Sequence, residues 1–132
     1  MLIFVDPNSG VPVYRQIVDQ IRFQIASGVA HAGDELPSTR ALSLQLGVNP
    51  MTVSKSYSLL EQEGLVERRP GLPLLVKKIP AGSAEANRTE ELRGLLDPAV
   101  TGVRQLGIPN KKALEVFRSM LEDAARRSET KE

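Results

Sequence analysis

The sequence predicts a mainly α-helical fold that carries one small β-hairpin. Apolar residues recur at steps of three and four in five stretches of the 132 residues, which is typical of helices buried along one side. Two of these stretches are short and lie only three residues apart. Farther along, two short runs flank a turn of proline and glycine at residues 70–73, which indicates the hairpin.

The first ten residues are expected to form an arm, because Asp6-Pro7-Asn8-Ser9-Gly10 is dense in turn-forming residues. A helix follows Pro12 and ends at Gly28. Its apolar stripe consists of Tyr14, Ile17, Val18, Ile21 and Ile25.

Two short helices are predicted after a loop at residues 28–37. Ser38 is a favourable N-cap for the first, which ends at Gly47. Asn49 caps the second, and Pro50 takes its first position, where a missing N–H costs no hydrogen bond. The second helix ends at Gly64. Because the turn between them is so short, the pair is expected to form a compact helix-turn-helix.

The hairpin, or wing, is predicted from strands at Leu65–Arg68 and Leu74–Lys78. Two prolines, Pro70 and Pro73, make its turn unusual. A linker rich in alanine, glycine and serine follows at residues 80–84. The sequence therefore divides into a winged helix-turn-helix domain of residues 1–79 and a helical segment of residues 80–132.

Two more helices are expected beyond the linker. The first crosses Asp97-Pro98, which forms either a kink or a new helix start, and the second begins at Asn110. Their apolar stripes either fold back on the first domain or pair with a second chain. A segment of about 50 residues cannot bury such stripes alone, which favours pairing with a second chain. A segment of this size also has little volume for an effector pocket of its own. The predicted pairing residues are Leu92, Leu95, Leu96, Val103, Leu106, Leu114, Phe117 and Leu121.

Composition excludes several classes of protein. The chain has no Cys and one His, His31, so thiol chemistry and metal sites built from several His or Cys are absent. No apolar run approaches the roughly 18 residues of a membrane span, and the start lacks the pattern of a signal peptide, which favours a cytoplasmic location. Asp34 and Glu35 are adjacent and diverge, and Ser38 has no nearby His. Neither an enzyme nor a cofactor is expected.

The net charge of +1 argues neither for nor against binding to nucleic acid. Only the distribution of charged residues along the chain can indicate such binding. If Val53, Tyr57 and Leu60 face the core, the outer side of their helix has short side chains near its N-terminus and no acid before Glu61. Such a helix can enter a major groove closely, with its N-terminal N–H groups available to phosphate. The candidate DNA contacts are Ser38, Thr39, Arg40, Asn49, Met51, Thr52, Ser54, Lys55, Ser58, Arg68, Arg69 and Gly71. The alternative is a protein-interaction module that uses the same face.

Four motifs carry a resemblance to a known family: Tyr14-Arg15-Gln16-Ile17, the run from Gly33 to Leu42, the run from Leu46 to Val53, and the run from Leu60 to Val66. Over residues 10–78 the chain resembles the DNA-binding domain of the GntR family of bacterial transcription regulators. Asn49-Pro50 and the short C-terminal segment resemble the YtrA-type branch. The resemblance implies a homodimer that binds an inverted-repeat operator, usually as a repressor, and it identifies no effector.

The chain departs from the family pattern in the wing and on the third helix. Many members carry Arg at the positions of Pro50 and Ser54. The wing usually ends Gly-x-Gly-Thr-Phe-Val, and here only Gly71 and Val76 match. These departures leave open whether the wing contacts DNA, and they place the expected reading of bases on the third helix.

Overall fold

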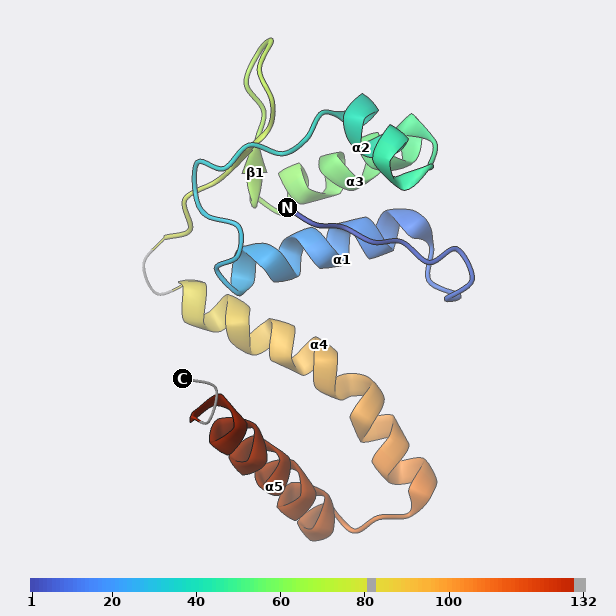
Figure 1. The fold of residues 1–132 in the computed structure, drawn as a ribbon, viewed down its shortest axis with the longest axis vertical. Coiled ribbons are helices and arrows are strands. Elements are labelled where there is room, and N and C mark those ends of the chain that lie inside the picture. Colours follow the sequence, from blue (N-terminus) through green and yellow to red (C-terminus); the bar gives the residue numbers. More distant parts are fainter. Residues whose placement is uncertain (81–82, 130–132) are drawn as a thin grey trace. The chain divides into compact units, whose positions relative to one another are not determined.

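The computed structural model describes residues 1–80 and 83–129, and the chain divides into two compact units, Met1–Glu91 and Leu92–Glu132. Within the described residues, five helices and two strands follow in the order α1 (Val13–Ala26), α2 (Thr39–Leu46), α3 (Pro50–Gln62), β1 (Val66–Glu67), β2 (Leu75–Val76), α4 (Ser83–Leu106) and α5 (Asn110–Glu129) (Figure 1). The predicted mainly helical fold with a hairpin is confirmed. Of the expected linker, residues 81–82 lie outside the described part, and Ser83 and Ala84 already belong to α4.

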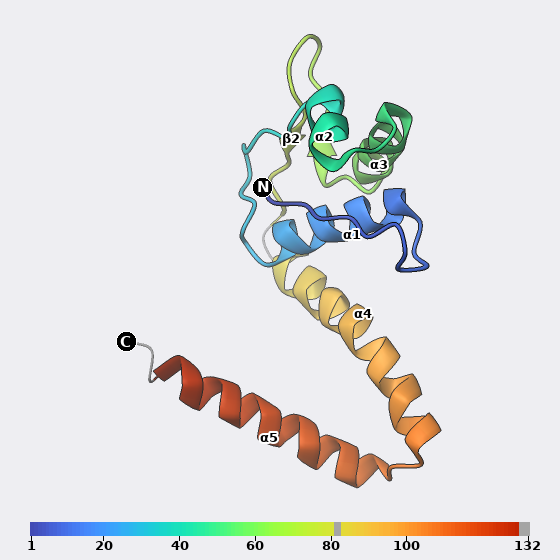
Figure 2. The ribbon, with the colours of Figure 1, turned by 45° about the vertical axis from the view of Figure 1, so that its right-hand side comes forward.

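The core of the first unit lies between α1, α2 and α3 (Figures 1 and 2). Helix α1 buries Ile17, Val18, Ile21 and Ile25, the stripe expected from the sequence, while Tyr14 is only half-buried. Helix α3 buries Val53, Ser56, Tyr57 and Leu60 against it. Aliphatic residues dominate this core, which agrees with an aromatic content of only 4%.

Capping residues fix both ends of the turn between α2 and α3. The Ala41 amide donates to Ser38 Oγ at 3.0 Å, and the Met51 amide donates to Asn49 Oδ1 at 2.9 Å. Gly47 ends α2 with φ at 67°, a left-handed conformation that other residues adopt at a cost. The helix-turn-helix therefore follows from local signals, as predicted.

The wing has shorter strands than expected and gains a third segment. Val66 pairs with Val76 in an antiparallel ladder, and Glu35 bridges Leu75 on the opposite edge of β2. The Val76 amide donates to the Asp34 carbonyl at 2.8 Å, and the Leu36 amide donates to the Leu74 carbonyl at 2.9 Å. The loop before α2 therefore ties the base of the wing to the helices.

The first residues are held along α1 by three glutamines at intervals of four. Gln16 bonds both the amide and the carbonyl of Asp6, at 2.7 and 2.8 Å, and Gln20 bonds both groups of Phe4. Gln24 donates to the Leu2 carbonyl at 2.6 Å. Two residues of an extended strand and four of a helix each rise about 6 Å, so the spacings match. The arm thereby buries Ile3, which the sequence had not indicated as core.

The second unit contains α4 from Leu92 onward and α5, joined at residues 107–109. Helix α4 runs on through Pro98, so no new N-cap forms there. Gly107 turns the chain with φ at 69°, and the Ile108 amide donates to the Val103 carbonyl at 3.1 Å. Within residues 83–129, neither α4 nor α5 has a buried residue. No helix in the described ranges is long and apolar enough to cross a membrane.

Candidate nucleic-acid interface

Helix α3 separates into a buried and an exposed side. Met51, Ser54, Lys55 and Ser58 are exposed, and Thr52 is half-buried at the edge. On the buried side, Ser56 Oγ lies 2.9 Å from the Thr52 carbonyl and 3.0 Å from the carbonyl of Tyr14 on α1. The outward direction expected for this face is confirmed.

Tyr57 links α3 to the segment that precedes α2. Its hydroxyl donates to the Pro37 carbonyl at 2.7 Å, and burial raises the pKa of the Tyr57 phenol well above its ordinary value. The phenol therefore stays protonated at any ordinary pH and keeps its hydrogen bond. This bond fixes the start of α2 relative to the exposed face of α3.

A groove of about 730 Å³ lies between the start of α2, helix α3 and the wing. Short hydroxyl side chains line its helical wall and two arginines line its wing wall. The structure brings together there Ser38, Thr39, Ser54, Ser58, Arg68, Arg69 and Gly71 of the predicted contacts. Arg40, Asn49, Met51, Thr52 and Lys55 belong to the same unit but do not line this groove. The groove thus combines hydrogen-bond donors with positive charge, which suits a phosphate backbone.

The Lys55 ammonium lies over the ring of Tyr14, a residue that was predicted to belong to the apolar stripe of α1. The Lys55 ammonium lies 3.8 Å from the centroid of the Tyr14 ring, and the Arg15 guanidinium lies 5.6 Å from it. Such cation–π contacts stabilise by about 0.5–1 kcal/mol at exposed sites. Two cations therefore lie close to the Tyr14 ring at the start of α1, beside the exposed face of α3.

The wing arginines and the capping residues already have partners within the chain. Arg68 pairs with Glu61 at 3.2 Å, and Arg69 donates to the Pro73 carbonyl at 3.1 Å. An exposed ion pair such as Arg68–Glu61 contributes about 0–1 kcal/mol, so a phosphate can replace it at small cost. Ser38 and Asn49 use an oxygen to cap their helices, and the Ser38 hydroxyl and the Asn49 Nδ2 group still offer hydrogens to a ligand.

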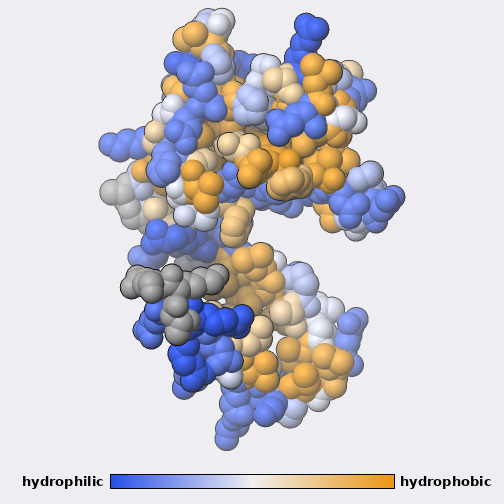
Figure 3. Space-filling model, in the orientation of Figure 1, coloured by the Kyte–Doolittle hydropathy of each residue, from blue (hydrophilic) through white to orange (hydrophobic). Residues whose placement is uncertain are grey.

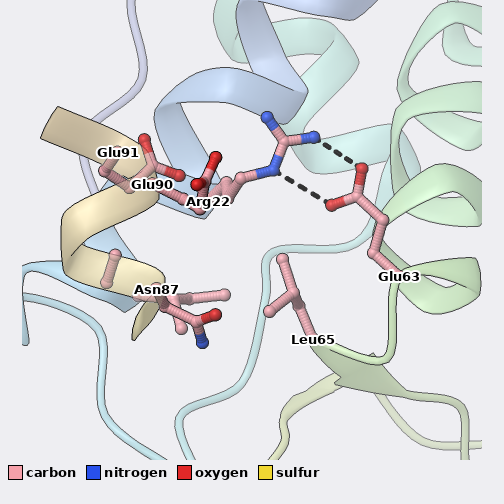
Figure 4. Close-up of a pocket in the computed structure, with 8 residues that line it drawn as sticks. Arg22, Glu63, Leu65, Asn87, Glu90 and Glu91 are labelled. Atoms are coloured by element: carbon pink, nitrogen blue, oxygen red, sulfur yellow. Dashed lines mark hydrogen bonds and ion pairs between the residues drawn. The ribbon is translucent and has the colours of Figure 1, made fainter. Parts of the chain in front are cut away.

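A second pocket, of about 220 Å³, has no predicted contact among its described lining residues, of which Arg22, Glu63 and Glu91 are labelled in Figure 4. Arg22 on α1 pairs there with Glu63 through Nε at 3.0 Å and a terminal nitrogen at 2.5 Å. The hydrogen bond to Glu63 raises the pKa of the Arg22 guanidinium, and burial raises the pKa of Glu91 in the third turn of α4. The ion pair joins α1 to the end of α3 and stabilises the frame that presents the interface.

The predicted pairing residues lie on the second unit with their side chains open to solvent. Leu92, Leu95, Leu106, Leu114, Phe117 and Leu121 are exposed, and Leu96 and Val103 are half-buried. An apolar groove of about 740 Å³ runs between α4 and α5, lined by Leu96, Val103, Leu114 and Phe117 among others. Figure 3 shows apolar residues on the surface of this unit. Such a surface is larger than single scattered apolar residues would give.

Comparison with known proteins shows which family the chain is similar to. The family model described as bacterial regulatory proteins, gntR family, matches residues 13–76. The repressor YtrA of Bacillus subtilis is 44% identical over 66 residues, which are 50% of this chain and 51% of YtrA. The uncharacterised regulator YhcF of the same organism is 32% identical over 115 residues, which are 87% of this chain and 94% of YhcF.

Two solved structures share the fold. YtrA from Sulfolobus acidocaldarius, described as a GntR-family transcription factor, is 30% identical with a TM-score of 0.56, covering 92% of this chain and 97% of that one. The DNA-binding domain of AraR in complex with an operator is 27% identical with a TM-score of 0.50, covering 58% of this chain and 94% of that one. The relatives thus match both the helix-turn-helix and the longer chain with its two C-terminal helices.

Proposed function

The chain belongs to the GntR family of bacterial regulatory proteins, which are DNA-binding transcription regulators and not enzymes, and we propose that it represses transcription as a homodimer on an inverted-repeat operator. The observation that carries the proposal is the exposed face of α3 beside the groove lined by Ser38, Ser54 and Arg68. Helix α3 enters the major groove, and the start of α2 and the wing contact phosphates. Such a regulator acts in the bacterial cytoplasm, where its operator is found.

Dimerisation through α4 and α5 is supported by their lack of buried residues within residues 83–129. A second copy of the chain covers the exposed leucines and Phe117, because a two-fold axis brings the same surface of the two copies together. We assign residues 1–79 to DNA binding and residues 80–132 to pairing. A two-fold protein requires a two-fold site, with half-sites about one turn of DNA apart, roughly 34–36 Å.

Repression, rather than activation, is supported by the relatives named as repressors, YtrA among them. A dimer that occupies about two turns of DNA at a promoter excludes polymerase without any further contact. No effector is assigned to this chain.

Selection of bound sequences from random duplex DNA tests the proposal. The intact chain is expected to enrich a two-fold symmetric motif, and a gel shift against the region upstream of its own gene should show the same site. A chain that enriches no sequence but captures a protein partner through α3 would instead be an interaction module.

Lys55 is expected to contribute affinity through a phosphate. Lys55→Ala should weaken binding and lower the slope of log affinity against log salt by about one unit, because one condensed counterion fewer is released. Tyr14→Leu should not lower the slope, because it frees the ammonium from the ring and leaves the charge available to the phosphate. Fluorescence anisotropy at several salt concentrations measures the slope.

Lys111→Ala is the matched control, since Lys111 is an exposed lysine on α5, far from the face of α3 along the sequence. It should leave the salt slope unchanged. An unaltered affinity and slope in Lys55→Ala would mean that the ammonium stays on Tyr14 when DNA binds.

A further inference from the structure

Met51 presents a large apolar side chain to solvent on the first turn of α3. It is 78% exposed, more than any other large apolar side chain in the described part of the chain. Its backbone amide is bonded to the Asn49 cap, so the position of its Cα is fixed while the thioether remains free. Exposing an apolar surface of this size to water is unfavourable, and covering it is worth about 25 cal/mol per Å².

The neighbours of Met51 on the exposed face are small. Ser54 and Ser58 follow at one and two turns, and both line the groove beside the wing. Lys55, the one long charged side chain among the exposed residues 51–58, is turned over the Tyr14 ring. Methionine is therefore the side chain that reaches farthest from the N-terminal half of α3.

Apart from Lys55, which the proposed function assigns to a phosphate, the same segment lacks a side chain placed for paired hydrogen bonds to one base. Two such bonds to adenine require both the oxygen and the nitrogen of an Asn or Gln side chain, and two to guanine require Arg or Lys. The Asn49 oxygen accepts from the Met51 amide, which leaves only its nitrogen. The long exposed polar residue Gln62 lies at the last turn of α3. Reading by the first turns must therefore use apolar contact or single hydrogen bonds.

From these observations we propose that Met51 determines specificity for thymine by packing on its C5-methyl group in the major groove. The inference rests on the proposed function, and adds which base chemistry the first turn of α3 recognises. Thymine is the base that presents a methyl group in that groove, and a flexible, polarisable thioether packs on it without an exact geometry. The serines nearby keep the helix close enough for this contact.

Replacement of thymine by deoxyuridine tests the inference, because it removes the methyl group and leaves every hydrogen-bonding group in place. The intact chain is first used to select its site from random duplex DNA. Each thymine of the selected duplex is then replaced in turn, and affinity is measured for the native chain and for Met51→Ala. At one thymine of each half-site, replacement by deoxyuridine should lower the affinity of the native chain about fourfold. This corresponds to the loss of one buried carbon group.

Met51→Ala should bind the thymine and deoxyuridine duplexes equally at that position, and Met51→Leu should retain a difference. Leu44→Ala is the matched control, because Leu44 is 74% exposed on α2 and lies outside the predicted contacts. It should keep the full thymine dependence. A selected site that is indifferent to every thymine methyl, or a dependence that survives in Met51→Ala, overturns the inference alone. Failure to enrich any sequence overturns the proposed function together with it.

Discussion

Replacing Leu114 and Phe117 by Glu in the full chain should separate the dimer and weaken binding to a complete inverted repeat by roughly 10²–10⁴-fold. Both side chains are exposed on the apolar stripe of α5, at 68% and 37%. The charges should therefore leave the folded chain intact while preventing a second copy from covering the stripe. Binding to an isolated half-site should change little, because each helix-turn-helix keeps its own contacts.

Sedimentation velocity measures the oligomeric state, and titration of full and half operators measures the affinities. Ser119→Glu is the control, since Ser119 lies on the side of α5 opposite the stripe and should leave the dimer unchanged. If the Leu114 and Phe117 variant sediments as a dimer, or binds the full operator as tightly as the native chain, the pairing surface lies elsewhere.

Leu60→Ala should lower the free energy of unfolding by about 2–5 kcal/mol. Leu60 is fully buried at the end of α3, in the cluster that contains Ile17 and Ile21 of α1. Removing its branched side chain leaves a cavity that the surrounding helices fill only partly. Chemical denaturation followed by circular dichroism measures the change.

Leu44→Ala provides the comparison, because Leu44 is on the solvent side of α2 and should change stability by about 0.5 kcal/mol or less. Equal effects of the two substitutions would contradict the assignment of the buried side of α3. The exposed face, and with it the proposed DNA contacts, would then be inverted.

The helix-turn-helix was predictable because its signals are local. Ser38, Gly47 and Asn49 each act on the backbone within three residues, so their cap and turn positions can be identified in the sequence. The side of α3 that is buried followed from the spacing of Val53, Tyr57 and Leu60, which one helical period fixes.

Features that depend on tertiary register were not predictable. Gln16, Gln20 and Gln24 hold the arm only because an extended segment lies antiparallel to α1, and no local pattern specifies that. The third segment of the wing, at Glu35, likewise depends on where the loop passes β2.

The exposure of the predicted contact residues on α3 could be predicted from the sequence, but the grouping of the predicted residues could not. Lys55 was expected to point away from the core, and its contact with the Tyr14 ring depends on how α1 crosses α3. The shared groove of Ser38, Ser54 and Arg68 depends on the position of the wing. The helical period implied that Met51 is exposed. It did not imply that Met51 is more exposed than every other large apolar side chain in the described residues.

Dimethyl sulfate interference on the selected operator tests most directly whether α3 reads the major groove. The reagent methylates guanine N7 in the major groove and adenine N3 in the minor groove, so it distinguishes the two. We expect guanine N7 methylation to abolish binding at two symmetric positions about one helical turn apart, and Met51→Ala and Lys55→Ala to keep the same pattern at lower affinity. Interference confined to adenine N3, or none within the half-sites, would contradict the account.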